Sequence, residues 1–95
     1  MTLPRIRNYG QYSSDNYGAH SLVVELGDLT VWFSYKTAVA FQVDGQPRVV
    51  RQNEWGPTTG KHLRWIDGDD KSSRVPGYEF ERLWNEQVAP LVSAA

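Results

Sequence analysis

The sequence predicts an α+β fold, in which a four-stranded antiparallel sheet, arranged as a meander, is packed by a short helix and a C-terminal amphipathic helix. Two observations lead to this class. Apolar and polar residues alternate through residues 20–52, as in strands with one buried face, and apolar residues recur at helical spacing through residues 80–91. Strands that all precede the helices are typical of α+β domains.

The 95 residues suit a single small domain, with a loop-rich segment at 1–19, antiparallel strands at 20–52 and helices at 59–92. Hydrophobic residues make up 40% of the chain and aromatic residues 13%, which is too apolar for a disordered protein. The absence of cysteine excludes disulfides and cysteine-bound zinc. The N-terminus lacks the apolar run of a signal peptide and no stretch resembles a membrane span, so we expect a soluble intracellular protein.

The clearest element is a hairpin, in which Gly27-Asp28 forms a two-residue turn between two apolar runs. The pairs that follow from this turn are Leu26 with Leu29, Val24 with Val31, Leu22 with Phe33, His20 with Tyr35 and, on the other face, Val23 with Trp32. A shift of one residue would exchange the two faces, so the alternation favours this register. Leu3–Arg7 has the pattern of a short edge strand, which the count of four strands leaves out.

A third strand is expected over Ala38–Val43, with Val39, Phe41 and Val43 on one face. Asp44-Gly45 is a strong turn signal, and Arg48–Gln52 follows as a fourth strand. The register of these two strands stays open. A two-residue turn sets Phe41 against Arg48, whereas a longer loop that includes Pro47 sets it against Val49 or Val50.

Two helices follow the strands. The first is expected over Gly60–Ile66, with Thr58 or Thr59 as its cap. The second begins near Pro76, and Pro90 ends or kinks it. The residues that recur at helical spacing on its apolar face are Phe80, Leu83, Trp84, Val88 and Leu91.

The stretch from Asn53 to Ile66, which joins the strands to the helices, is the strongest candidate for a site. A chain that enters a helix through Gly, Pro and Thr presents unpaired backbone N–H groups, which suit an anion. Lys61 and the threonine hydroxyls would complete such a site; otherwise the threonines only cap the helix and Lys61 is solvated. Gly56–His62 is not a nucleotide-hydrolysing phosphate loop, because only three residues separate its glycines and His62 follows the lysine.

Other chemical motifs are weaker. Asp67, Asp69 and Asp70 resemble the start of a calcium loop, but Lys71 occupies a ligand position, so no calcium site is expected. Two histidines without cysteine do not indicate a metal centre, and we expect no cofactor. Ser34 and His62 can be combined with an aspartate into a catalytic trio, but most chains of this length allow such a choice, so we expect no enzyme.

Aromatic and basic residues are interleaved between residues 32 and 65, which is how proteins hold single-stranded nucleic acid. The residues in question are Trp32, Lys36, Arg48, Arg51, Trp55, Lys61, Arg64 and Trp65. The favoured alternative is that Trp32 packs in a second small core beneath residues 53–66. The net charge of −1 also lacks the basic signature of a nucleic-acid-binding domain. Likewise, Tyr17 and His20 either cover the core or reach a site.

Three stretches resemble a family of small uncharacterised proteins from bacteriophages and their actinobacterial hosts. They are Asn16-Tyr17-Gly18-Ala19-His20, the run from Phe33 to Phe41, and the run from Trp55 to Leu63. The resemblance spans most of residues 16–83 and carries no assigned activity. It implies a setting in the cytoplasm of a bacterial host, where a small phage protein commonly acts by binding a host protein, a defence component or a signalling nucleotide.

We therefore predict a small non-enzymatic binding module that acts on a host protein or host defence pathway. The alternatives are nucleic-acid binding through residues 32–65 and sequestration of a small phosphorylated, nucleotide-like ligand. Self-association through exposed sheet edges is conceivable, and no membrane partner is expected. The predicted binding residues are Tyr17, His20, Tyr35, Lys36, Trp55, Thr58, Thr59, Lys61 and His62.

Overall fold

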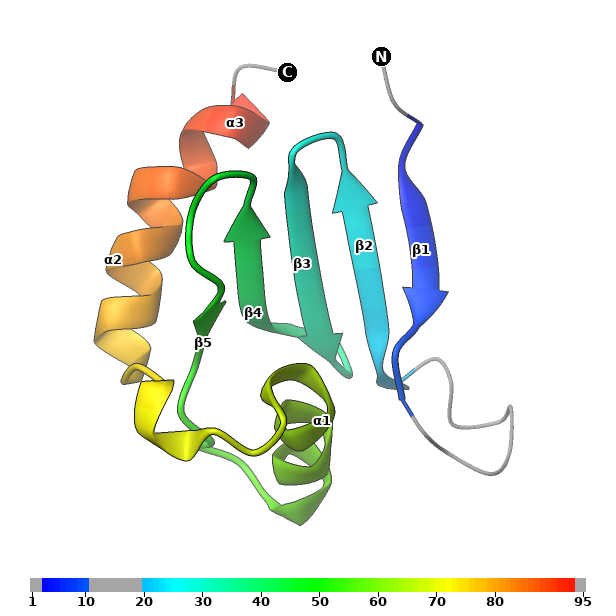
Figure 1. Ribbon diagram of the computed structural model, residues 1–95, viewed down its shortest axis with the longest axis vertical. Coiled ribbons are helices and arrows are strands. Elements are labelled where there is room, and N and C mark those ends of the chain that lie inside the picture. Colours follow the sequence, from blue (N-terminus) through cyan, green and yellow to red (C-terminus); the bar gives the residue numbers. More distant parts are fainter. Residues whose placement is uncertain (1–2, 11–19, 94–95) are drawn as a thin grey trace.

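The computed structural model describes residues 3–10 and 20–93 and confirms the α+β class (Figure 1). Its elements are β1 (Arg5–Asn8), β2 (Leu22–Leu26), β3 (Leu29–Ser34), β4 (Thr37–Val43), β5 (Val49–Val50), α1 (Pro57–Asp67), the 3₁₀ turn η2 (Lys71–Ser73), α2 (Gly77–Gln87) and α3 (Ala89–Ser93). The strands form one antiparallel meander in the order β1-β2-β3-β4-β5.

The sheet has five strands, so the predicted count of four was wrong. The additional strand is β1, which lies within the segment expected to be loop-rich and pairs with β2 from Arg5 opposite Glu25 to Asn8 opposite Leu22. All four of its residues are exposed. β1 therefore has no buried face to produce alternation in the sequence, and its backbone hydrogen bonds alone make it a strand.

The predicted β2–β3 hairpin is confirmed in its register. Leu26 pairs with Leu29, Val24 with Val31 and Val23 with Trp32. Gly27 supplies the positive φ of 61° that a tight turn between these strands requires.

The faces of β4 differ from the prediction. Trp32 pairs with Ala40, but Phe33 pairs with Ala38, so Val39 is the additional residue of a β-bulge. The bulge places Val39 beside Ala40 in the core under α1, not beside Phe41 as the simple alternation predicted. A period of two cannot reveal an inserted residue, because the pattern on either side of it is still regular.

The open register between β4 and β5 is settled in favour of the longer loop, since Phe41 pairs with Val49 and Ala40 with Val50. β5 is only two residues long, shorter than the expected Arg48–Gln52. Beyond it, Arg51 forms an isolated parallel bridge with Val75, so the chain that leads into α2 continues the pairing.

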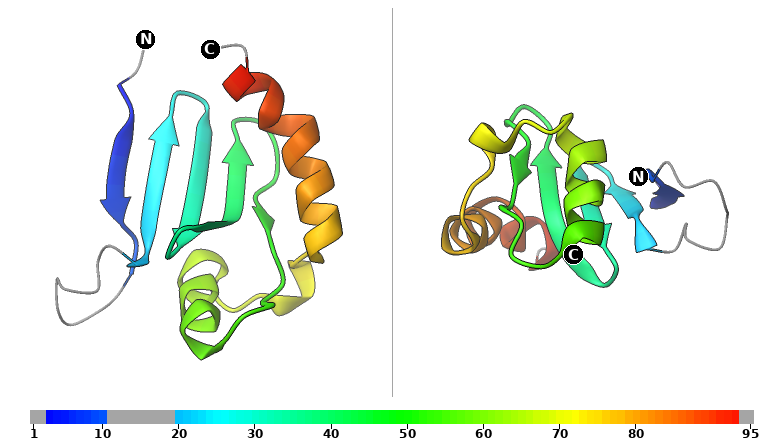
Figure 2. Two further views of the ribbon diagram at one scale, coloured as in Figure 1. Left: turned by 180° about the vertical axis from the view of Figure 1, so that it is seen from behind. Right: turned by 90° about the horizontal axis from the view of Figure 1, so that it is seen from below.

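The sheet separates two small cores. One core lies against α2 and contains Leu29, Val31, Phe41, Val49, Phe80 and Val88. The other lies against α1 and contains Val39, Ala40, Val50, Leu63 and Ile66, with Tyr9 and Trp32 packed beside it. Successive side chains of a strand point to opposite faces, so the two helices cover opposite faces of the sheet. They lie apart in every view, with α2 alongside β5 (Figures 1 and 2).

The second core confirms the packing role expected for Trp32. The Arg48 guanidinium lies 4.9 Å from the centre of the Trp32 ring, and Arg48 donates a hydrogen bond to the carbonyl of Ile66. Both side chains of this pair are therefore engaged in holding the end of α1 to the sheet.

The start of α1 corrects the predicted cap. The helix begins at Pro57 with Gly56 as its N-cap, and no side chain caps it, so neither Thr58 nor Thr59 has the capping role. Proline is preorganised for the first helical position, which lets the helix begin earlier than the threonines indicated. Thr59 is thereby turned toward the sheet and buried. The helix ends at Asp67, and its C-cap is Gly68, whose φ of 65° suits glycine.

The C-terminal helix is largely as predicted. α2 begins after Pro76, and Phe80 and Trp84 pack against Phe41 with ring centres 5.3 and 5.5 Å away. The helix ends at Gln87 and α3 begins at Ala89, which confirms that Pro90 interrupts it. Within the described ranges, no helix is long and apolar enough to cross a bilayer.

Candidate functional site

His62 is the centre of a buried polar cluster between α1 and the end of β3. Thr59 and His62 are three residues apart in α1, so both face the sheet, and β3 ends at Ser34 directly opposite them. The Ser34 Oγ is 2.7 Å from His62 Nδ1 and 3.0 Å from Thr59 Oγ1. His62 is 0% exposed and Ser34 is 3% exposed. The three side chains thus satisfy one another's hydrogen bonding inside the fold.

Aromatic rings surround this cluster. Tyr35 stacks on His20 with ring centres 4.7 Å apart and lies 5.8 Å from the His62 ring. Trp65 approaches His62 to 5.8 Å, and Tyr9 meets it edge-on at 6.2 Å. His62 therefore lies in an environment that disfavours charge.

The imidazole of His62 has a lowered pKa. Burial is the main cause, and the nearby positive charges of His20 and Lys61 act in the same direction. His62 is consequently neutral at pH 7. The pair formed with Ser34 has the geometry of a nucleophile and its base, although both side chains are enclosed by the fold.

A small cavity opens beside this cluster, at the turn between β3 and β4. We call it the turn cavity; it has a volume of about 140 Å³, and the described residues that line it are Ser34, Tyr35, Thr37, Val39, Trp55 and Thr59. Tyr35 is 47% exposed and Trp55 is 46% exposed. The two rings are therefore the accessible part of a wall whose deeper residues, Ser34 and Thr59, are buried.

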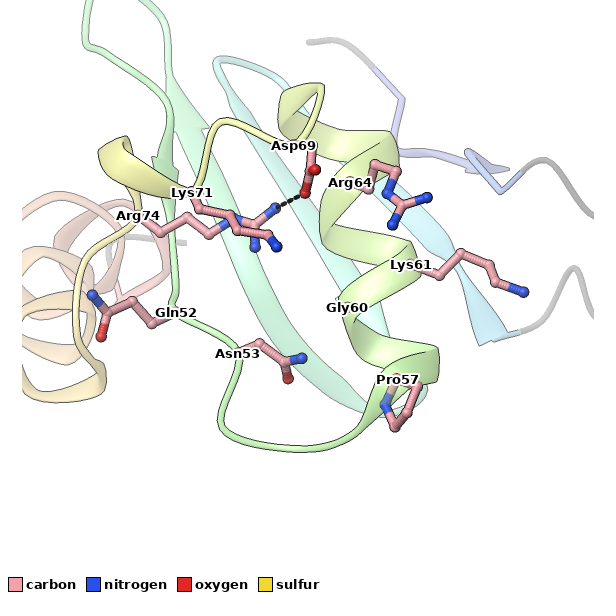
Figure 3. Close-up of a pocket in the computed structure, with 9 residues that line it drawn as sticks. All are labelled: Gln52, Asn53, Pro57, Gly60, Lys61, Arg64, Asp69, Lys71 and Arg74. Carbon is pink, nitrogen blue, oxygen red and sulfur yellow. Dashed lines mark ion pairs between the residues drawn. The ribbon is translucent and has the colours of Figure 1, made fainter.

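A larger cavity lies between α1, the chain after β5 and the η2 turn (Figure 3). We call it the basic cavity; it has a volume of about 590 Å³, and its lining is formed by Gln52, Asn53, Pro57, Gly60, Lys61, Arg64, Asp69, Lys71 and Arg74. Four of these side chains are cationic and one is a carboxylate. The basic cavity is the larger of these two, and none of the described residues lines both cavities.

The cations of the basic cavity are not equivalent. Arg74 is held by two hydrogen bonds to Asp67, at 2.7 and 2.9 Å, which raise the pKa of its guanidinium, and Asp69 is 3.8 Å away. Arg64 and Lys71 form no ion pair within the described part of the chain. Lys71 reaches toward α1, whereas Arg64 and Lys61 both extend from the side of α1 that lies away from Lys71 (Figure 3). Arg64 and Lys71 are thus two lining cations that no ion pair occupies among the described residues.

The structure distributes the predicted binding residues over three places. The buried cluster brings together four of them, which are His20, Tyr35, Thr59 and His62. The turn cavity is lined by Trp55 together with Tyr35 and Thr59. Lys61 lines the basic cavity. Thr58 and Lys36 line neither cavity, and Tyr17 lies outside the described residues.

The sequence did not predict that Lys71 and Arg74 lie beside α1. It included Arg64 only among the interleaved aromatic and basic residues between residues 32 and 65. The spacing of Lys61 and Arg64 could have indicated that both lie on one side of a helix. Lys71 lies in the aspartate-rich stretch that resembled the start of a calcium loop, and Arg74 follows it. Only the return of the chain beside β5 brings these two residues to α1.

The interleaved aromatic and basic residues do not form one surface. Trp32 packs beside the core under α1, and the Arg48 guanidinium lies over its ring. Arg51 forms ion pairs with Glu54 and Glu81 and lies over the Trp55 ring. These cations are already neutralised or used in packing.

The fold and its cavities define a small α+β protein with two separate concave sites beside α1. The chain belongs to a family of unknown function (DUF8033), whose sequence pattern matches residues 5–82 and so covers most of its length. No curated protein and no solved structure matches the chain. Within residues 3–10 and 20–93, no group of three or more His, Asp or Glu side chains is placed to hold a metal ion.

Proposed function

We propose that this protein is a non-enzymatic binding module that holds a small phosphate-bearing ligand in the basic cavity. The observation that carries the proposal is that one cavity is lined by two cations, Arg64 and Lys71, which have no ion-pair partners among the described residues. An arginine can bind a phosphate through two parallel hydrogen bonds, and a lysine adds a compact positive charge.

The size of the cavity favours a small ligand over a host protein, which the sequence had put first. A volume of about 590 Å³ lies in the range of small-molecule sites, roughly 300–1,000 Å³. A stable protein–protein interface instead covers about 800 Å² on each partner and is comparatively flat. We therefore place sequestration of a nucleotide-like ligand ahead of host-protein binding.

The start of α1 supports the same choice. Pro57 and Gly60 line the cavity, and the first turn of the helix carries neither an acidic residue nor a side-chain cap. The positive end of the helix dipole is therefore not offset locally, and it adds to the attraction for an anion.

The setting forms part of the proposal. The motifs that resemble phage and actinobacterial proteins suggest that the module acts in the cytoplasm of a bacterial host, where it withholds a phosphorylated ligand from a defence or signalling pathway. Nucleic-acid binding is less well supported, because Trp32, Arg48 and Arg51 are engaged in packing or ion pairs.

Calorimetric titration with pyrophosphate tests the proposal. We expect saturable binding at low salt that weakens at high salt, because the contacts are ionic. Arg64→Ala and Lys71→Ala should each weaken binding about tenfold, the usual loss for a hydrogen bond to a charged group. Lys36→Ala is the matched control, since Lys36 is an exposed lysine that lines neither cavity, and it should bind as the wild type does.

Two results would contradict the proposal. One is equal affinity of the Lys71→Ala and Lys36→Ala variants, which would make the interaction a general effect of charge. The other is an absence of pyrophosphate binding together with capture of one host protein by the wild type but not by Lys71→Ala, which would restore the host-protein reading.

A further inference from the structure

The turn cavity combines features that packing alone does not require. Its accessible walls are the rings of Tyr35 and Trp55, each about half exposed, and behind them lie the hydroxyls of Ser34 and Thr59. Single exposed rings are normal on a protein surface, but here two of them border the same cavity. Here two large aromatic surfaces flank an open space at the edge of the fold.

Tyr35 also has a backbone conformation that tyrosine rarely adopts. Its φ is 56°, in the left-handed region, and it is one of two described non-glycine residues with a positive φ. Its N–H donates to the His20 carbonyl at 2.9 Å, and its ring stacks on the His20 ring. A glycine would turn the chain here without strain, so the strained position presents a ring where glycine would have none.

Described residues from each of the three stretches that carry the phage-protein resemblance meet at this place. His20, the last residue of the first stretch, stacks on Tyr35. The second contains Ser34 and Tyr35, and the third contributes Trp55 and Thr59. Residues far apart in the sequence thus build one small site.

We infer that the turn cavity is a second ligand site, which takes a single planar heteroaromatic ring of pyrimidine size. A volume of about 140 Å³ matches a cavity that holds one six-membered ring, and the space is too small to enclose a fused double ring. Stacking on Tyr35 or Trp55 would bind the faces of the ring. The Thr37 hydroxyl can donate or accept at the ring edge. The hydroxyl oxygens of Ser34 and Thr59, which already bond each other and His62, keep lone pairs that can accept.

This site is independent of the basic cavity, because no described residue lines both. None of the described residues that line the turn cavity is cationic, so a neutral nucleoside should bind there without a phosphate. The failure of pyrophosphate to bind the basic cavity would therefore leave this inference intact, and the reverse also holds.

Tryptophan fluorescence of the whole protein, titrated with uridine, cytidine, adenosine and ribose, tests the inference. We expect saturable quenching by uridine or cytidine, weaker binding of adenosine and no response to ribose. Tyr35→Gly and Trp55→Leu should weaken nucleoside binding about tenfold, the order found when a stacking aromatic is removed. Tyr78→Ala is the matched control, because Tyr78 is exposed on α2 away from the cavity, and it should leave binding unchanged.

Binding of pyrophosphate to Tyr35→Gly provides the second measurement, and it should match the wild type. The inference is overturned if neither pyrimidine nucleoside binds saturably, or if a folded Tyr35→Gly variant binds them as well as the wild type does. Adenosine binding as tight as that of uridine, or displacement of uridine by pyrophosphate, would also overturn it, because the ring would then occupy a different space.

Discussion

At the scale of single residues, His62 shows how a polar side chain acquires its properties from the fold. The sequence placed it, beside Lys61, among the predicted binding residues. In the structure it is buried, bonded to Ser34 and surrounded by rings, so its chemistry is that of a neutral imidazole. Removal from water, rather than its neighbours in the sequence, is the main cause.

The lowered pKa of His62 predicts a pH dependence of stability. In the unfolded chain the pKa is close to the usual value of about 6.5, and in the folded protein it is lower. Below pH 6.5 the unfolded chain takes up a proton that the folded protein does not. The contribution of neutral His62 to the free energy of unfolding should therefore be fully present at pH 7 and above. As the pH drops from 6.5 toward the folded-state pKa, the free energy of unfolding should fall by up to about 1.4 kcal/mol per pH unit.

Urea unfolding at pH 7.5, 6.5 and 5.5 measures this dependence. His62→Gln removes the titrating group and should unfold with a shallower pH dependence, while His20→Gln should lie between the two, because His20 helps to lower the pKa of His62. If wild type and His62→Gln lose stability in parallel over this range, His62 does not hold a lowered pKa in the folded protein.

At the scale of elements, Tyr35 and Lys36 form the turn that joins β3 to β4. The φ of 56° at Tyr35 sets the geometry of this turn. Tyr35→Ala should lose the stacking on His20 and keep the strain, whereas Tyr35→Gly should lose the stacking and relieve the strain. The left-handed region costs an L-residue about 1–2 kcal/mol, and the added freedom of glycine in the unfolded chain offsets part of that. We expect the glycine variant to be more stable than the alanine variant by about 1 kcal/mol.

Chemical denaturation of both variants at one pH provides the comparison. Gly45, which already has a positive φ of 84° in an open turn, supplies the control: Gly45→Ala should destabilise, because it introduces the strain that Tyr35→Gly removes. An alanine variant at position 35 as stable as the glycine variant would show that the backbone at Tyr35 carries no strain.

The elements themselves were predictable to different degrees. The β2–β3 hairpin and the start of α2 follow from local patterns: an alternation of two, a glycine in the turn and a proline before the helix. The bulge at Val39 and the exposed strand β1 leave no such pattern, because one is a single inserted residue and the other has no buried face.

At the scale of the whole molecule, the ion pair between Asp67 and Arg74 joins the end of α1 to the chain that returns beside β5. Both side chains are nearly buried, at 6% and 5% exposure. Removing one partner of a buried pair leaves an uncompensated charge and costs about 3–5 kcal/mol. Asp67→Asn should lose about 3 kcal/mol, the low end, because Asp69 at 3.8 Å still offsets part of the charge of Arg74.

A double variant separates this cost from simple loss of packing. Asp67→Leu/Arg74→Met replaces the pair with apolar side chains and should recover much of the stability, since a buried pair itself contributes little relative to a packed apolar substitute. Thermal or urea unfolding of the single and double variants checks this. A double variant less stable than Asp67→Asn would show that the pair stabilises the fold in its own right.

The sequence by itself determined what depends on neighbours along the chain. The α+β class, the order of strands before helices and the register of the central hairpin all arise from periodicity and turn residues. The packing role of Trp32 was also predictable from the sequence, because small residues on the opposing strand leave room for a large ring. Part of the candidate site was also accessible in this way, since His20, Tyr35, Trp55 and Thr59 were chosen from the motifs that converge there.

Only the tertiary structure decided which of the charged and polar residues are available to a ligand. Arg48 and Arg51 are bound within the fold, whereas Arg64 and Lys71, from a helix and a distant loop, line one cavity. His62 became part of the interior, and Tyr35 and Trp55 became the walls of a second cavity. The physical reason is that burial and ion pairing depend on contacts between distant segments, and the return of the chain beside β5 sets those contacts without a local signal.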